Sequence, residues 1–150
     1  MKKHIITLLL SALALLPAAA QKGLAIDDLF GGHYRNRADV VEVLLRGKSL
    51  KGYGLTLFRS LVMPGVGHDG LRVEQKVCAD VADAVEKEVG YKKGRLYYGF
   101  FRLKPQGKGA PHRFIFYRNN ELRDDRKPEL TLIYMEGTAG MEELRRTFAK

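Results

Sequence analysis

Valine recurs at every fourth position in the middle of the chain, and this spacing is the clearest periodic signal in the sequence. The residues concerned are Val73, Val77, Val81, Val85 and Val89. A four-residue step keeps side chains on one face of an α-helix, so the pattern predicts an amphipathic helix that ends at Gly90. The valine face, together with Cys78, is expected to lie in the core.

Three segments of the C-terminal half have the apolar and aromatic content that is typical of β-strands. They span residues 95–103, 113–118 and 129–135. Glycine, proline and asparagine mark the connections between them, and such short connections favour antiparallel pairing of consecutive strands. A further strand is predicted at residues 39–46, which are rich in valine and leucine.

Three other segments show helical patterns. Residues 26–30 predict a short helix that opens on two aspartates, and residues 140–149 predict a final helix. Residues 50–62 have apolar positions at helical spacing, although Gly52 and Gly54 weaken this helix. This order of elements predicts an α+β fold, with a mainly antiparallel sheet of about four strands and helices packed on one face.

The first twenty residues do not fit this domain. Two lysines precede an apolar run over residues 5–16, and residues 17–20 read Pro-Ala-Ala-Ala. That order is typical of a secretory signal peptide, and the run is too short for a membrane span of about 20 residues. We therefore predict a signal peptide at residues 1–20 and a single α+β domain at residues 21–150. The expected location is the periplasm or the cell exterior, with no transmembrane segment after cleavage. No lipid anchor is expected either, because the cleavage region contains no cysteine.

The charge of the chain is basic and its cysteine content is minimal. The 26 lysines and arginines exceed the 17 acidic residues by nine, and loss of the two lysines of the signal leaves an excess of +7. Such a charge favours encounters with anionic polymers without specifying one. A single cysteine, Cys78, excludes an intramolecular disulfide.

Two segments resemble nucleotide-binding loops, but both lack part of the motif. Gly47-Lys48-Ser49 has Glu42 where a phosphate-binding loop needs its first glycine. The segment Gly65–Gly70 matches G-x-G-x-x-G, but a helix is predicted before it, and no parallel strand–helix–strand unit surrounds it. The sequence therefore predicts no nucleotide partner.

The candidate chemistry is scattered along the chain. His33, His68 and His112 have no histidine or glutamate partner at helical spacing, so no local metal motif is present. His68 and Asp69 would need a distant histidine to complete the site of a small metal-dependent hydrolase. Basic residues beside the aromatic strands are candidates for contact with an anionic ligand; they are Lys104, Lys108, His112 and Arg113.

Several segments together resemble the small exported families of unknown function found in Bacteroidetes. They are the signal that ends in Ala-Gln, Ile-Asp-Asp-Leu-Phe at 26–30, Val-Glu-Val-Leu-Leu at 41–45 and Leu-Thr-Leu-Ile-Tyr-Met-Glu-Gly at 130–137. The resemblance implies an α+β fold and a Gram-negative envelope or extracellular setting. It supplies no catalytic residues.

These observations favour a non-enzymatic binding or accessory domain of the bacterial envelope over an enzyme. Its expected partner is a protein or an anionic envelope component, and no catalytic residue, cofactor or bound metal is assigned. Two alternatives stay open at this point. One is the metal-dependent hydrolase that would use His68 and Asp69, and the other is a basic module that binds anionic polymers.

Overall fold

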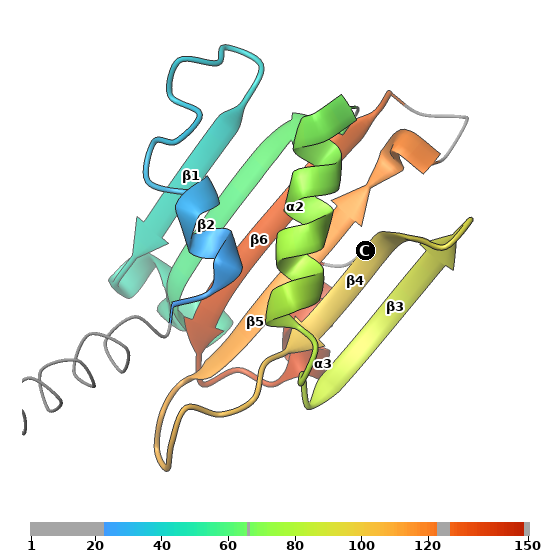
Figure 1. The fold of residues 1–150 in the computed structure, drawn as a ribbon. Coiled ribbons are helices and arrows are strands. Elements are labelled where there is room, and N and C mark those ends of the chain that lie inside the picture. Colours follow the sequence, from blue (N-terminus) through green and yellow to red (C-terminus); the bar gives the residue numbers. More distant parts are fainter. Residues whose placement is uncertain (1–22, 66, 123–126, 149–150) are drawn as a thin grey trace, which may run out of the picture.

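Six β-strands form one antiparallel sheet in the order β1-β2-β6-β5-β4-β3 (Figure 1). The computed structural model describes residues 23–65, 67–122 and 127–148. The strands are β1 (Val41–Arg46), β2 (Leu55–Pro64), β3 (Glu86–Lys92), β4 (Arg95–Arg102), β5 (His112–Asn119) and β6 (Glu129–Gly137). Every neighbouring pair is antiparallel. The predicted fold class is confirmed, although the sheet has six strands rather than four.

Both faces of the sheet are apolar. Successive side chains of a strand point to opposite faces, and the central strands have consecutive apolar residues. On the central strand β6, Leu130 and Leu132 belong to one buried cluster, whereas Ile133 and Met135 belong to the other. The first cluster also contains Leu61, Met63, Phe101, Ile115 and Tyr117. The second contains Phe100, Phe114 and Phe116. The sheet therefore needs a cover on each side.

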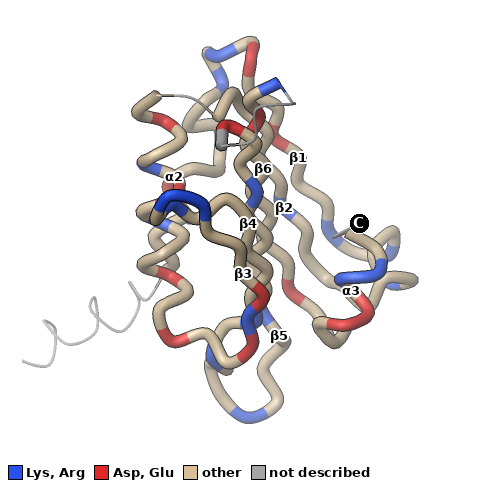
Figure 2. Tube along the Cα trace, turned by 90° about the vertical axis from the view of Figure 1, so that its right-hand side faces the viewer, with Lys and Arg blue, Asp and Glu red and all other residues tan. Residues whose placement is uncertain are grey.

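Helices supply that cover on both faces (Figure 2). α2 (Gly67–Asp80) and the 3-10 helix η1 (Ala25–Leu29) pack against the first cluster, in which Val73 is fully buried. α3 (Met141–Phe148) packs against the second cluster through Leu144. The expectation that helices cover one face is therefore wrong, because the aromatic strands direct large side chains to both sides.

The predicted valine helix is divided between a helix and a strand. α2 ends at Asp80, and β3 begins at Glu86. Val85 and Val89 are consequently 48% and 38% exposed rather than buried in the core. A step of four residues is also an even step, so it keeps side chains on one face of a strand as well as on one face of a helix. The period alone does not distinguish the two structures.

The helix predicted at residues 50–62 is also wrong. Only Lys48–Tyr53 forms a helical turn, the 3-10 helix η2, and Gly54 ends it in a left-handed conformation with φ 68°. The chain then enters β2, which lies between β1 and β6. Because β2 buries residues on both faces, its apolar positions do not alternate strictly and resemble a helical pattern.

The other predicted elements are confirmed within a few residues. The strands predicted at 39–46, 95–103, 113–118 and 129–135 correspond to β1, β4, β5 and β6, and the helix at 140–149 corresponds to α3. The short helix predicted at 26–30 is η1. The predicted signal peptide lies outside the described residues. Within the part of the chain that is described, no helix has the length and apolar character needed to cross a membrane.

Candidate functional site

The three histidines of the predicted domain lie in different parts of the fold. His68 is in the first turn of α2, which follows the end of β2, whereas His112 begins β5. The end of β2 pairs with the start of β6 and His112 pairs with the end of β6, which places the two positions roughly 25 Å apart along the strand direction. His33 lies in a loop, with its ring edge-on to Tyr34 at a centroid distance of 4.6 Å.

Asp69 and His112 each have a contact within the chain. The Asp69 carboxylate accepts a hydrogen bond from Arg37 at 2.6 Å, and Nδ1 of His112 lies 3.0 Å from the carbonyl oxygen of Ala139. Within residues 23–65, 67–122 and 127–148, no three His, Cys, Asp or Glu side chains form a group that could hold a metal ion. In the described part of the chain, the fold therefore does not assemble the metal site that the hydrolase alternative requires.

Two of the predicted ligand-contact residues do come together. Lys104 and Arg113 line a hollow of about 390 Å³ below the end of α2, and Arg113 donates a hydrogen bond to the carbonyl oxygen of Lys104 at 3.1 Å. Arg113, Gln106 and Leu24 also line an adjoining hollow of about 430 Å³. We call the two together the Arg113 cleft. Of the other predicted residues, Lys108 is exposed, and His112 lines a separate hollow of about 250 Å³.

The Arg113 cleft carries mixed charge. In the second hollow, Arg59 and Arg113 occur together with Asp27, Tyr134 and Glu136. Arg113 and Glu136 are direct cross-strand neighbours, as are Arg59 and Tyr134. Because carboxylates line the cleft together with its cations, the cleft does not offer the uniformly positive surface that attracts a polyanion.

The phenol of Tyr134 is held as a hydrogen-bond donor in this cleft. Its hydroxyl donates to Oε1 of Glu136 at 2.6 Å. Burial raises the pKa of Tyr134, and the Glu136 carboxylate raises it further because a second negative charge beside it is unfavourable. The positive charge of Arg113 opposes this shift, but burial and Glu136 outweigh it, so the phenol stays protonated at neutral pH.

The predicted basic surface is partly neutralised elsewhere too. Arg95 forms an ion pair with Glu74 of α2 at 2.9 Å, and Arg102 lies 2.7 Å from Glu86. Figure 2 shows acidic and basic positions interspersed over the side of the molecule that faces the viewer. The alternative of a basic polymer-binding module gains no support from this distribution.

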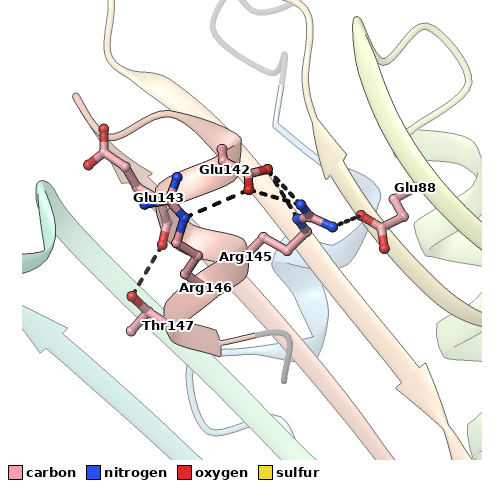
Figure 3. A network of polar contacts seen from close by, with 6 residues as sticks. All are labelled: Glu88, Glu142, Glu143, Arg145, Arg146 and Thr147. Carbon is pink, nitrogen blue, oxygen red and sulfur yellow. Dashed lines mark hydrogen bonds and ion pairs between the residues drawn. The ribbon is translucent and has the colours of Figure 1, made fainter.

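A network of exposed charges connects α3 to the edge strand β3 (Figure 3). Arg145 lies between Glu142, at 2.8 Å, and Glu88 of β3, at 3.8 Å. The hydrogen bond from Arg145 lowers the pKa of Glu142. Exposed ion pairs of this kind contribute at most about 1 kcal/mol each, so the network adds little stability, and its charges are paired with one another.

Cys78 occupies an exposed position on α2, which corrects the prediction that it is buried. It follows the fully buried Val77 by one residue, and a helix turns by about 100° per residue. Its thiol is still partly shielded, and this burial, with the nearby Glu74 carboxylate, raises the pKa of Cys78. The thiol is therefore largely protonated at neutral pH and a weak nucleophile.

A strand precedes the segment Gly65–Gly70, and the last four residues of the segment are the start of a helix, which corrects the prediction that a helix precedes it. β2 ends at Pro64, and α2 begins at Gly67. The dinucleotide fingerprint nevertheless requires a parallel strand–helix–strand unit, and every strand pair of the sheet described here is antiparallel. In the second segment, Gly47-Lys48-Ser49, Gly47 precedes the six-residue 3-10 helix η2, and Lys48 and Ser49 are its first two residues.

The most distinctive surface is the edge strand β1, which sequence reasoning predicted as a strand but not as a site. All six of its residues are exposed, and Val41, Leu44 and Leu45 are 58%, 52% and 42% exposed. β1 pairs with β2 on one side and forms the end of the described sheet on the other. An edge strand presents unpaired backbone N–H and C=O groups. β1 therefore combines open hydrogen-bonding groups with exposed apolar side chains.

Comparison with known proteins identifies a family but no function. No curated protein and no solved structure matches the chain. A family model described as a family of unknown function, DUF6108, matches residues 13–148. The resemblance to a family of unknown function is thereby confirmed, while the Bacteroidetes origin and the export stay predictions. The chain belongs to the family of unknown function DUF6108.

Proposed function

We propose that this chain is an exported, non-enzymatic binding domain of the bacterial envelope, and that it takes up a protein partner by strand addition at β1. The observation that carries the proposal is that all six residues of this edge strand are exposed. In strand addition, an extended segment of the partner pairs with an open sheet edge, and main-chain hydrogen bonds supply the affinity.

The α3-side face of β1 is apolar, and on the α2 side Leu44 lies between the two charged residues Glu42 and Arg46. Leu45 pairs with Phe58, so it lies on the α3 side together with Val41 and Val43. Leu44 pairs with Arg59 on the α2 side, where the Arg59 guanidinium lies 4.4 Å from the centre of the Phe30 ring. A partner strand with apolar residues at alternate positions would bury these side chains.

Export gives the proposal its setting. The basic start, the apolar run and the Ala-x-Ala end of residues 1–20 support it. A domain that acts in the envelope meets other exported chains and surface polymers. The mixed charge of the Arg113 cleft favours a protein partner over an anionic polymer.

Site-specific cross-linking tests the proposal. A photoreactive benzophenone residue is placed in turn at positions 41, 43 and 45 of the full chain, and at position 89 of β3 as the matched control. The protein is then recovered from the envelope fraction, where the mature N-terminus is expected at Gln21. Strand addition predicts that the three β1 positions cross-link to partner residues that are themselves two positions apart, since paired strands have the same period.

Two results would contradict the proposal. One is cross-linking from position 89 as efficient as that from position 45. The other is cross-linked residues on the partner that show no two-residue spacing, which would indicate an ordinary surface contact. Recovery of an uncleaved chain from the cytoplasm would contradict the export half of the proposal independently of the binding half.

A further inference from the structure

We propose that the partner strand is β1 of a second copy of this chain, paired antiparallel about a two-fold axis through Leu44. This inference rests on the proposed function, because it uses the same edge. The result would be a continuous sheet across two copies, with both α2 helices on one side and both α3 helices on the other. A symmetric dimer of this kind needs one self-complementary surface, and the sequence of β1 is self-complementary.

Backbone geometry limits the possible registers. Along β1, alternate residues direct their N–H and C=O groups toward β2 or away from it. Two copies pair only if outward-facing residues meet outward-facing residues, so the symmetry axis must pass through a residue and not between two residues. Within the strand Val41–Arg46, axes at Val43 and Leu44 each keep five of the six residues paired, and an axis at Leu45 keeps three.

Charge selects one of these three registers. An axis at Leu44 places Glu42 opposite Arg46 of the second copy, and the same pair occurs again by symmetry. An axis at Val43 would place Glu42 opposite Leu44, and an axis at Leu45 would place Arg46 opposite Leu44. Opposite charges directly across a strand pair stabilise it. Only the Leu44 register avoids setting a charge against a leucine.

The Glu42 carboxylate already has two partners in its own chain but is not saturated by them. Its carboxylate accepts hydrogen bonds from the backbone N–H groups of Gly31 at 2.7 Å and Gly32 at 3.1 Å. A carboxylate has about four lone-pair sites on its two oxygens, so capacity remains for the guanidinium of a second copy. Glu42 and Arg46 are both exposed on the α2 side, since they pair with Leu61 and Leu57.

The apolar side chains complete the match. In the Leu44 register, Val43 lies opposite Leu45 of the second copy, twice by symmetry, on the α3 side. Leu44 lies opposite Leu44 of the second copy on the α2 side. These three positions are all exposed in the single chain. The pairing would therefore remove from water the side chains that make a bare edge strand prone to aggregation.

The opposite edge of the sheet, β3, is less suited to pairing with a second copy. β3 contains a register shift between Gly90 and Tyr91, whereas the pairing of β1 with β2 is unbroken over its length. Bulges and lysines on an edge strand oppose pairing with another chain, and β3 contains Lys87 and Lys92. Glu86 is also engaged by Arg102 of the same chain. Of the two edges, β1 is the one suited to a second copy.

Charge reversal tests the dimer and its register together. Full chains are expressed, and the proteins recovered from the envelope fraction are compared by sedimentation over a range of concentrations. E42R and R46E each place like charges opposite one another at both symmetric positions, so the dissociation constant of the dimer should rise about tenfold or more. The double variant E42R/R46E restores opposite charges and should dimerise like the wild type.

An equimolar mixture of the two single variants tests the proposed register most directly. An E42R chain and an R46E chain have complementary charges only toward each other, so the mixture should form a heterodimer although neither variant dimerises well alone. This rescue cannot be produced by a loss of folding in either chain. L44K should also prevent dimerisation, and V89K on β3, as the matched control, should not.

The failure of this inference is distinguishable from failure of the proposed function. A wild-type protein that stays monomeric at hundreds of micromolar would overturn the self-pairing. In that case, two-residue-spaced cross-links from β1 to a different envelope protein would preserve the proposed function. A dimer that V89K weakens and the mixture of charge variants does not restore would also overturn the inference.

Discussion

Replacing Gly137 with valine is expected to lower the free energy of unfolding by about 3 kcal/mol, or to prevent folding, because the position has no room for a side chain. A Cβ atom at Gly137 would overlap the carbonyl oxygen of Gly54 and lie 2.7 Å from Cα of Leu55. That carbonyl accepts hydrogen bonds from the N–H groups of Thr138 at 2.9 Å and Ala139 at 3.0 Å. It therefore cannot move away without losing both.

Chemical denaturation of the Gly137→Val variant measures this cost, with Gly107→Val as the control. A Cβ atom at Gly107 would meet no other atom within 4 Å, so this variant should unfold within about 0.5 kcal/mol of the wild type. The comparison also tests the strand β2, because Gly137 approaches Leu55 only where β2 pairs with β6. Equal stability of the two variants would contradict that pairing.

Truncation of Phe100 to alanine is the second change with a large expected effect, about 4 kcal/mol of lost stability. Phe100 is fully buried between α3 and the sheet. Its ring centroid lies 6.1 Å from that of Phe114 and 6.0 Å from that of Phe116. The deletion would leave a cavity beneath α3 that these rings cannot fill, since they are held in their own strands.

Urea unfolding of Phe100→Ala beside Tyr91→Ala checks this prediction. Tyr91 is another aromatic residue of the sheet, but it is 63% exposed, so its truncation should change stability by no more than about 0.5 kcal/mol. The difference tests whether the second face of the sheet is a true core. If Phe100→Ala were no more destabilising than Tyr91→Ala, α3 would not cover that face.

The C-terminal strands could be predicted because their signals are local. Dense apolar and aromatic content and turn-forming connections define β4, β5 and β6 without knowledge of the rest of the chain. The elements between β1 and β4 were harder. A valine every four residues fits a helix or a strand, and β2 loses its alternation because both of its faces are buried. In these two places tertiary contacts decide between structures that the local pattern permits.

Which candidate residues meet in space depends on the order of the strands in the sheet, and local sequence patterns do not reveal that order. β6 inserts between β2 and β5, and this insertion separates the start of α2, with His68, from His112. It also leaves β1 at an edge. The lysine and arginine that do meet, Lys104 and Arg113, were found because they flank the same predicted connection. Glu42 and Arg46 at the two ends of an apolar run are visible in the sequence. They indicate self-pairing only if the strand is known to lie at an open edge of the sheet.

Backbone hydrogen exchange is the most direct test of the claim that β1 is the binding surface. The purified protein is measured at concentrations below and above the dissociation constant of the dimer. The outward-facing N–H groups among Val41–Arg46 should exchange more slowly as the concentration rises, while those of Glu86–Lys92 in β3 should not change. Exchange in β1 that is the same at every concentration, and the same when a cross-linked partner is present, would contradict the account.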